Sequence, residues 1–145
     1  MPRKSPLSDG AGPWTERVLP TRLEAIRQPQ QDVLLRMRDL GYSEDQQFAV
    51  RLALEEALVN AMKHGNRMDP VRHVRVAYRV MPEQVEIHVA DEGEGFDPGQ
   101  VADPTCDENL AKPCGRGVML MRCYMDEVTY LDNGREVHMV KYRRP

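Results

Sequence analysis

The sequence predicts an α+β fold, a two-layer sandwich in which a mostly antiparallel mixed sheet carries helices on one face. Three observations support this class. Two segments with helical spacing of apolar residues occupy the first half of the chain. Two pairs of segments with alternating apolar residues follow, each pair joined by a short turn. A third helical segment separates the pairs, so the strands within each pair are expected to be antiparallel neighbours.

Length and composition fit a single folded domain. The chain has 145 residues, of which 41% are hydrophobic and 30% charged, an ordinary globular balance that can bury a core. Pro, Gly and Ser are frequent in residues 1–13, which we expect to be a flexible lead-in, and residues 14–145 are expected to form the domain. The formal net charge of −3 gives no reason to expect direct nucleic-acid or membrane binding.

The sequence carries no sign of export, membrane insertion or disulfides. No apolar run approaches the roughly 20 residues of a membrane helix, and no apolar stretch follows the basic N-terminus as in a secretory signal. We therefore expect a cytoplasmic protein. Cys106, Cys114 and Cys123 lack C-x-x-C spacing and are expected to be free thiols rather than zinc ligands.

The domain is expected to begin with a strand and a helix. The segment "WTERVLP" is short and rich in residues that favour strands, so it is expected to be an opening or edge strand. From Thr21 to Leu40 the apolar residues recur at helical spacing, and Pro29 is expected to kink or split this helix. Gly41 is suited to end it.

A second helix follows at once. Ser43, with Gln46 three residues later, predicts a capping box at its start. The helix is therefore expected from about Glu44 to Lys63, with Gly65 as its stop.

The remaining chain is expected to form two hairpins around a loop and a helix. "HVRVAYRV" and "QVEIHVAD" alternate apolar and polar residues about the turn "MPEQ", and "EVTYL" and "EVHMVKY" flank "DNG". Helices are expected over one face of these strands and solvent over the other. Between the hairpins, residues 97–113 show no period and are expected to form a mobile, functional loop. "GRGVMLMRCYMDEV" is expected to open a third helix.

A polar row interrupts the second helix. Glu56, Asn60 and His64 recur every fourth residue, bordered by apolar residues, which suits a polar cavity; the alternative is a solvated face with chance spacing. The amide oxygen of Asn60 is a suitable Mg²⁺ ligand, and Glu56 one turn earlier could take a proton near that metal. Lys63 and His64 could approach phosphate oxygens, or His64 could simply complement the helix dipole.

A second candidate element is "DEGEGF", which ends the first hairpin. Asp91 ends an apolar strand, so its carboxylate is expected at the rim of a cleft, where it can accept a hydrogen bond from an exocyclic amine such as that of adenine. Gly93 and Gly95 permit a sharp turn and the approach of a flat ligand to the backbone, and Phe96 completes the segment. The pattern alone also fits many acidic turns.

A third candidate element is "CGRGVML". Gly115 and Gly117 precede a helix whose first turn contains Val118, and free backbone N–H groups at a helix start favour an anion. Arg116 could add charge-assisted bonds to phosphate, or it could be an exposed side chain.

Together these elements resemble a known family. E-x-x-x-N-A-x-x-H-G-N, then D-E-G-x-G-F about 30 residues on, then G-R-G before a helix, look like the N, G1 and G2 boxes of the GHKL (Bergerat-fold) ATPase superfamily. Within it the chain is most similar to the anti-sigma-factor serine/threonine kinases. The resemblance covers roughly Trp14 to the C-terminus and implies the histidine-kinase-like ATPase fold.

The resemblance also implies residue roles. Glu56 matches the general base, Asn60 the magnesium ligand and Asp91 the carboxylate that reads adenine. The glycines of the third element match those that contact phosphate. The nucleotide-contacting residues that we expect are Asn60, Lys63, His64, Gly65, Asp91, Gly93, Gly95, Phe96, Gly115, Arg116, Gly117 and Val118.

The implied function is an ATP- and Mg²⁺-dependent regulatory kinase. It would phosphorylate a serine on a small anti-sigma-antagonist protein and control a sigma factor by partner switching; the family often forms homodimers. Some kinases of this family carry an arginine two residues before the first lid glycine, where it meets the terminal phosphate. Here that position is Pro113, with Lys112 beside it and Arg116 between the glycines, so a non-catalytic ATP-dependent protein-binding switch is the alternative. A detached histidine-kinase domain is less favoured, because such domains usually lack an acid at the position of Glu56.

Overall fold

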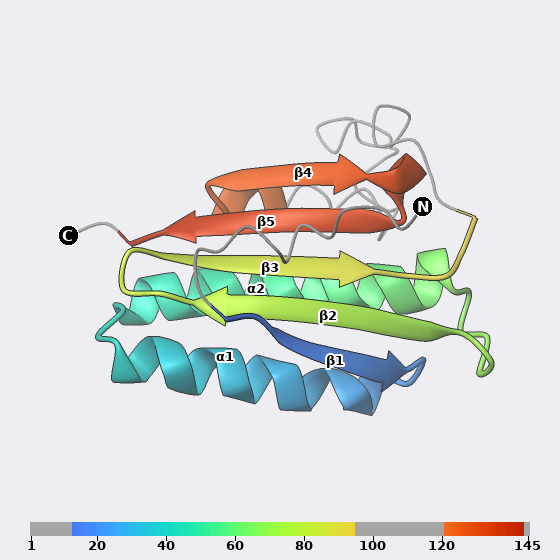
Figure 1. The fold of residues 1–145 in the computed structure, drawn as a ribbon, viewed down its shortest axis with the longest axis horizontal. Coiled ribbons are helices and arrows are strands. Elements are labelled where there is room, and N and C mark those ends of the chain that lie inside the picture. The colour runs from blue at the N-terminus through green and yellow to red at the C-terminus, as the bar shows by residue number, and fades with distance from the viewer. Residues whose placement is uncertain (1–12, 95–120, 144–145) are drawn as a thin grey trace, which may run out of the picture.

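The computed structural model describes residues 13–94 and 121–143, and within them the chain forms one five-stranded sheet (Figure 1). The strand order is β1-β2-β3-β5-β4, and each neighbouring pair is antiparallel. The strands are β1 (Thr15–Pro20), β2 (His73–Val80), β3 (Gln84–Ala90), β4 (Glu127–Leu131) and β5 (Glu136–Tyr142). The expected strands and hairpins are confirmed.

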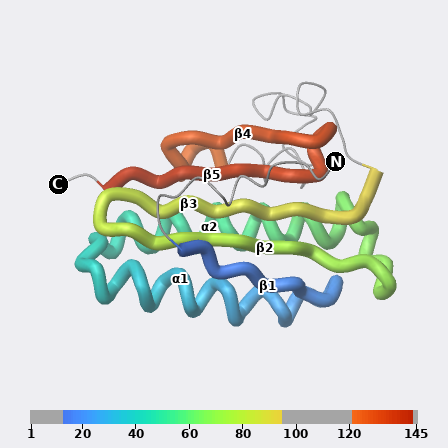
Figure 2. The backbone as a smooth tube through the Cα atoms, viewed as in Figure 1, coloured from blue at the N-terminus to red at the C-terminus, as the bar shows by residue number. Residues whose placement is uncertain are grey.

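Both long helices cover the same face of the sheet (Figure 2). α1 (Arg27–Asp39) packs against β2, and α2 (Glu44–Asn60) packs against β3 and β5. Strand register explains this arrangement, since Val76 pairs with Val89 and Val89 pairs with Val137, which puts these apolar side chains on one face. The two-layer α+β prediction is confirmed. The fully buried residues between the layers include Val33, Met37, Leu54, Leu58, Tyr78, Ile87 and Met139.

The opposite face is not the solvated surface that the alternation predicted. Arg79, Glu86 and His88 are only 3%, 8% and 9% exposed. Arg79 donates to Glu86 and lies 4.4 Å from the ring centroid of Trp14, and His88 stacks on His138 at 4.1 Å. Charged side chains tolerate burial when they are paired, and a period-two pattern does not reveal such pairing.

The start of α1 differs from the expectation. A 3-10 turn, η2 (Leu23–Ile26), precedes it, and Pro29 lies in the first turn of the α-helix. A missing N–H costs little there, so Pro29 neither kinks nor splits α1. The predicted stop is confirmed. Gly41 has φ +84°, and its N–H donates to Arg38 O at 3.0 Å in a left-handed cap.

The start of α2 confirms the capping box. Ser43 N donates to Gln46 Oε1 at 3.1 Å, and Gln46 N donates to Ser43 Oγ at 3.1 Å. Two otherwise unbonded N–H groups of the helix start are thereby satisfied. The capping box fixes where the helix begins.

The end of α2 differs from the expectation. The helix widens into a π-helix, η3 (Ala61–Gly65), closed by a 2.8 Å bond from Asn66 N to Ala61 O. Gly65 therefore remains in the helix instead of stopping it. The left-handed residues come later, at Arg67 (φ 52°) and Met68 (φ 57°). Such widened turns occur frequently at functional sites.

The last part of the described chain agrees with the predicted pattern. Residues 121–124 are helical, and Met121 and Met125 are 1% and 5% exposed. The β4–β5 turn, η5 (Asp132–Gly134), has positive φ throughout. Cys123 is a free, exposed thiol, as expected. None of the helices within residues 13–94 and 121–143 combines the length and apolar character needed to cross a membrane.

Candidate active site

The polar row on α2 lies at the border between core and solvent. Glu56 and Asn60 are partly exposed, while Ala57 and Leu58 beside them are buried. Glu56 is close enough to Lys63 in the π-helix for their charges to interact. Because the buried residues Ala57 and Leu58 hold the helix on the sheet, the side chains of the polar row face away from the core.

The turn after β3 packs directly on the end of this helix. A Cβ on Gly65 would lie 2.2 Å from Oδ2 of Asp91, and a Cβ on Gly93 would lie 1.9 Å from the carbonyl oxygen of Gly65. A side chain at Gly65 would meet the Asp91 carboxylate and one at Gly93 would meet backbone, so the two glycines permit this close approach. Gly93 does not adopt positive φ, so close packing on Gly65, rather than a sharp turn, explains the glycine. Figure 1 shows the end of α2 beside the end of β3.

Asp91 has one carboxylate oxygen, Oδ2, without a hydrogen-bond donor among residues 13–94 and 121–143. Gly93 N donates to the other oxygen, Oδ1, at 2.8 Å. Burial raises the pKa of Asp91, and the Gly93 bond and the charges of Arg135 and Arg72 only partly oppose this. A half-buried carboxylate oxygen between Gly65 and Gly93 is suited to accept a hydrogen bond from the amine of a flat nucleotide base.

Glu56 has the electrostatic character of a base. Burial raises its pKa, Glu55 beside it raises the pKa further, and Lys63 opposes both. A carboxylate with a raised pKa works as a base closer to neutral pH.

Two residues that hold the turn after β3 were not identified from the sequence. Asn66 is fully buried, and its Oδ1 accepts the N–H of Glu92 at 2.8 Å. Arg135 donates from Nε to the carbonyl oxygen of Gly93 at 2.7 Å. Asn66 closes the H-G-N motif, which is a signal that could have been used. Arg135 has no sequence signal, because its role depends on a contact across the sheet.

Of the other expected site residues, some are exposed near the end of the π-helix and the rest lie outside the described residues. Lys63 and His64 are exposed at the end of the π-helix, where either interpretation of His64 still applies. Among the described residues no group of three or more His, Cys, Asp and Glu side chains could hold a metal. A magnesium ion held by Asn60 and water is a different type of site. The following residues lie outside the described ones: Gly95, Phe96, Cys106, Lys112, Pro113, Cys114, Gly115, Arg116, Gly117 and Val118.

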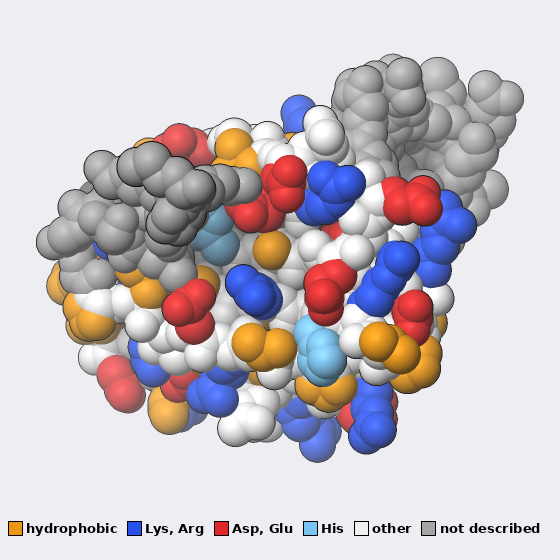
Figure 3. Space-filling model, turned by 45° about the vertical axis from the view of Figure 1, so that its right-hand side comes forward, with side chains coloured by type: hydrophobic (Ala, Val, Ile, Leu, Met, Phe, Trp, Pro, Cys, Tyr) orange, Lys and Arg blue, Asp and Glu red, His pale blue; other side chains and the backbone are white. Residues whose placement is uncertain are grey.

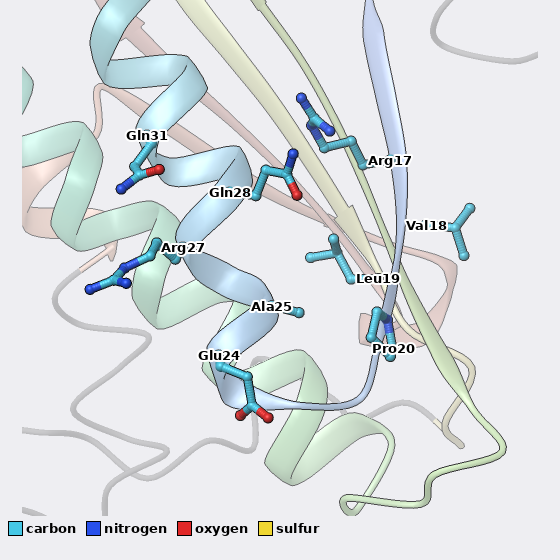
Figure 4. A pocket seen from close by; sticks show the side chains of 9 residues that line it. All are labelled: Arg17, Val18, Leu19, Pro20, Glu24, Ala25, Arg27, Gln28 and Gln31. Atoms are coloured by element: carbon cyan, nitrogen blue, oxygen red, sulfur yellow. The ribbon is translucent and has the colours of Figure 1, made fainter.

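Two surface hollows lie apart from this site. One, of about 600 Å³, separates β1 from α1, with Arg17, Leu19 and Gln28 among its walls (Figure 4). The other, of about 660 Å³, lies between η2, the start of α1 and α2 and reaches Glu55 and Val59. Neither is lined by an expected site residue. The face seen in Figure 3 mixes acidic and basic side chains, which agrees with the small net charge.

Comparison with known proteins identifies the family. Residues 17–141 match the model of the histidine kinase-like ATPase domain. The chain belongs to this family. The expected resemblance is confirmed, and ATP is the nucleotide that membership implies.

Curated relatives carry kinase names. The serine-protein kinase RsbW of Bacillus licheniformis is 33% identical over 111 residues, which cover 71% of this chain and 69% of the relative. RsbW of Bacillus subtilis (strain 168) is 32% identical over 110 residues, with the same coverage. The serine/threonine-protein kinase BtrW of Bordetella bronchiseptica is 32% identical over 85 residues, covering 57% of this chain and 60% of the relative. These names agree with the expected activity.

A solved structure supports the fold. The RsbU and RsbW domains of Rv1364c from Mycobacterium tuberculosis superpose with a TM-score of 0.62 at 16% identity, covering 92% of this chain. This chain spans 34% of that longer protein. At this identity the likeness is evidence for the fold only, and it agrees with the predicted sandwich.

Proposed function

We propose that this protein is an ATP-dependent serine/threonine kinase of the RsbW type. It phosphorylates a serine on a small anti-sigma-antagonist protein and controls a sigma factor by partner switching. One observation carries the proposal: the row of Glu56 and Asn60 leads to Gly65, against which Asp91 lies. The proposed general base (Glu56), metal ligand (Asn60) and adenine-binding carboxylate (Asp91) therefore lie near the same end of α2. The kinase names of the relatives support the same activity.

Asp91 selects the nucleotide. Its Oδ2 accepts a hydrogen bond from the exocyclic amine of adenine, while Gly65 and Gly93 place no side chains beside this carboxylate. Guanine has a carbonyl oxygen where adenine has this amine, and two acceptors repel each other. The turn therefore favours ATP over GTP.

Asn60 and Glu56 serve the transfer step. Asn60 would hold Mg²⁺ through its amide oxygen, and the metal would supply positive charge that neutralises phosphate. Glu56 takes the proton of the serine hydroxyl. The hydroxyl oxygen forms a bond to the γ-phosphorus of ATP while the bond between this phosphorus and the ADP oxygen breaks. The raised pKa of Glu56, caused first by burial, suits this role. The residues proposed on the phosphate side are Lys63, His64, Gly115, Arg116, Gly117 and Val118.

The wider assignment follows from the same proposal. Residues 14–145 form the single ATPase domain and assemble as a homodimer, in keeping with the family resemblance. A sigma factor as partner places the protein in the cytoplasm, without direct contact to nucleic acid or membrane.

Phosphoryl transfer from labelled ATP tests the proposal. Wild type, Glu56→Gln and Asn60→Ala are incubated with Mg²⁺ and the antagonist candidate encoded beside the gene. Wild type labels a serine; Glu56→Gln loses about 10²–10⁴-fold in rate while it still binds ATP in calorimetry. Asn60→Ala loses the Mg²⁺-dependent part of ATP binding. Glu44→Gln, at an exposed glutamate in the first turn of the same helix, is the matched control and keeps the activity.

The outcomes separate two functions. ATP binding without transfer to the antagonist, in wild type as in Glu56→Gln, favours the non-catalytic switch. Absence of ATP binding in wild type contradicts both.

A further inference from the structure

In the turn formed by Asp91, Glu92 and Gly93, here called the Asp91 turn, every backbone N–H group and the last carbonyl oxygen are hydrogen bonded. Asp91 N donates to Arg135 O at 2.9 Å, Glu92 N to Asn66 Oδ1 at 2.8 Å, and Gly93 N to Asp91 Oδ1 at 2.8 Å. The carbonyl oxygen of Gly93 accepts from Arg135 Nε at 2.7 Å. Two residues outside the turn, Asn66 and Arg135, therefore fix it from two sides.

Asn66 joins the turn to the starts and ends of other elements. Its Nδ2 donates to Thr21 Oγ1 at 3.1 Å and to His73 O at 3.0 Å, so both amide donors are paired as well as Oδ1. Thr21 follows β1, and its hydroxyl donates to Arg72 O at 2.6 Å. A fully buried amide bonded in this way has one orientation. Asn66 also directly follows Gly65, on which the Asp91 carboxylate lies.

Arg135 holds the turn from the β4–β5 hairpin. Its side chain is 32% exposed, and its Nη1 lies 3.5 Å from Oδ1 of Asp132. Its main-chain oxygen and its guanidinium contact opposite ends of the turn, at Asp91 and Gly93. The guanidinium charge also acts on the Asp91 carboxylate. Arg135 therefore holds the Asp91 turn by hydrogen bonds and by the charge of its guanidinium.

We propose that Asn66 and Arg135 are positioning residues for base recognition, which hold the Asp91 turn on Gly65 so that Oδ2 meets the base in one orientation. The inference rests on the proposed function of Asp91. Neither residue needs to touch the nucleotide, because each acts through the turn. Their loss weakens ATP binding and the preference for ATP over GTP, while the transfer step at saturating ATP is nearly unchanged.

Arg135→Ala is the first test, because Arg135 is partly exposed and belongs to a hairpin turn. We expect about tenfold weaker ATP binding in calorimetry, as for loss of one charge-assisted hydrogen bond. The ATP-to-GTP affinity ratio falls by a similar factor, KM for ATP rises, and kcat stays within about twofold. Arg135→Lys, which keeps the charge, recovers part of the affinity.

Arg143→Ala is the matched control. Arg143 also donates to carbonyl oxygens, those of Leu40 at 2.8 Å and Gly41 at 3.1 Å, but beyond the opposite end of β5. Loss of this arginine is expected to lower the melting temperature without changing either nucleotide affinity. It separates a general loss of stability from a loss of positioning.

Asn66→Ala tests the other side of the turn, with ATP and GTP affinities measured alongside the melting temperature. Because Asn66 is fully buried, this variant could fail to fold, and Thr21→Val then removes only the hydroxyl that Asn66 contacts. Thr21→Val is expected to lower the ATP-to-GTP ratio about two- to fivefold. Thr21→Ser keeps the hydroxyl and is expected to match wild type.

The results distinguish this inference from the proposed function. If wild type binds ATP, but Arg135→Ala and Thr21→Val keep its ATP-to-GTP ratio, the two residues are merely structural and the inference is wrong. A fall in kcat at unchanged affinity also contradicts it. If wild type binds no ATP, the proposed function is wrong and the inference goes with it.

Discussion

Two partly buried carboxylates, Asp32 in α1 and Asp91 after β3, have opposite environments. Asp32 accepts a hydrogen bond from the hydroxyl of Tyr78, another from Arg36 Nε at 3.2 Å, and lies 3.6 Å from Arg17 Nη2. Burial tends to raise the pKa of Asp32, but the Tyr78 bond and the two arginine charges outweigh it and hold the pKa below its ordinary value. The partners of the Asp32 carboxylate, Tyr78, Arg36 and Arg17, are therefore side chains of the protein itself.

Asp91 shows the reverse balance. Burial raises its pKa, and the bond from Gly93 and the charges of Arg135 and Arg72 do not cancel that effect. Glu56 resembles Asp91, because burial and Glu55 raise its pKa more than Lys63 lowers it.

The difference separates a carboxylate that is paired within the fold, Asp32, from the two that we propose serve the nucleotide, Asp91 and Glu56. An ionised carboxylate with internal partners favours the folded state, whereas one with a free oxygen costs stability until a ligand binds. Residues of the second kind concentrate at functional sites. The raised pKa values of Asp91 and Glu56 therefore indicate the same end of α2 as the sequence motifs, although they are independent of the motifs.

The largest expected effect compares Asp91→Asn with Asp32→Asn. Asp91→Asn removes the charged group that we propose accepts a hydrogen bond from the adenine amine, so we expect ATP affinity to fall on the order of 10²-fold. Asp32→Asn leaves ATP affinity within about twofold. Calorimetric titration of both variants measures this, and equal losses would remove the distinction between the two carboxylates.

The next comparison replaces the two glycines beneath Asp91. In Gly65→Ala the new Cβ meets the Asp91 carboxylate, which can rotate away, so ATP affinity falls about tenfold or more while the fold persists. In Gly93→Ala the Cβ meets the backbone oxygen of Gly65, which cannot rotate away, so unfolding free energy falls by about 1–3 kcal/mol.

Thermal denaturation and ATP titration of both variants check this pair. A Gly65→Ala variant that binds ATP like wild type would show that the carboxylate position is unimportant.

Local signals in the sequence account for most of the fold. Ser43 and Gln46 define the start of α2, Gly41 ends α1, and alternating residues place the strands. Each depends on residues only a few positions apart, so each can be read without tertiary structure. The proposal of Glu56 and Asn60 as site residues also begins from local information, their helical spacing.

Features that depend on distant contacts escaped prediction. The bond from Glu92 to Asn66 spans 26 residues and that from Arg135 to Gly93 spans 42. The burial of Arg79 and Glu86 depends on their pairing across two strands. Gly65 looked like a helix stop, because the carboxylate that requires a glycine there comes from another element.

A smaller effect concerns the stability that Asp32 supplies. Asp32→Asn weakens the bonds from Tyr78 and Arg36, so the unfolding free energy at neutral pH falls by about 1–2 kcal/mol. Tyr78→Phe should lose slightly less. Asp39→Asn is the matched control on the same helix, because Asp39 is exposed, and urea unfolding should leave it near wild type. A neutral Asp32→Asn variant would contradict the assigned role.

The smallest effect is the pH dependence of the two carboxylates. The folded pKa of Asp32 is lowered, so its contribution is present above the unfolded pKa, about 3.9, and is lost as pH falls through the folded value. The folded pKa of Asp91 is raised, so folding is favoured below the unfolded pKa and that advantage disappears as pH rises through the folded value.

Urea unfolding of wild type, Asp32→Asn and Asp91→Asn between neutral and acid pH measures both contributions. As pH falls, the stability of wild type relative to Asp32→Asn decreases, while its stability relative to Asp91→Asn increases. Neither slope exceeds about 1.4 kcal/mol per pH unit, the limit for one proton. Slopes of the same sign would mean that the fold treats the two carboxylates alike. Saturating ATP should reduce or reverse the Asp91 slope, because in the proposed function the ligand binds the ionised form of this carboxylate.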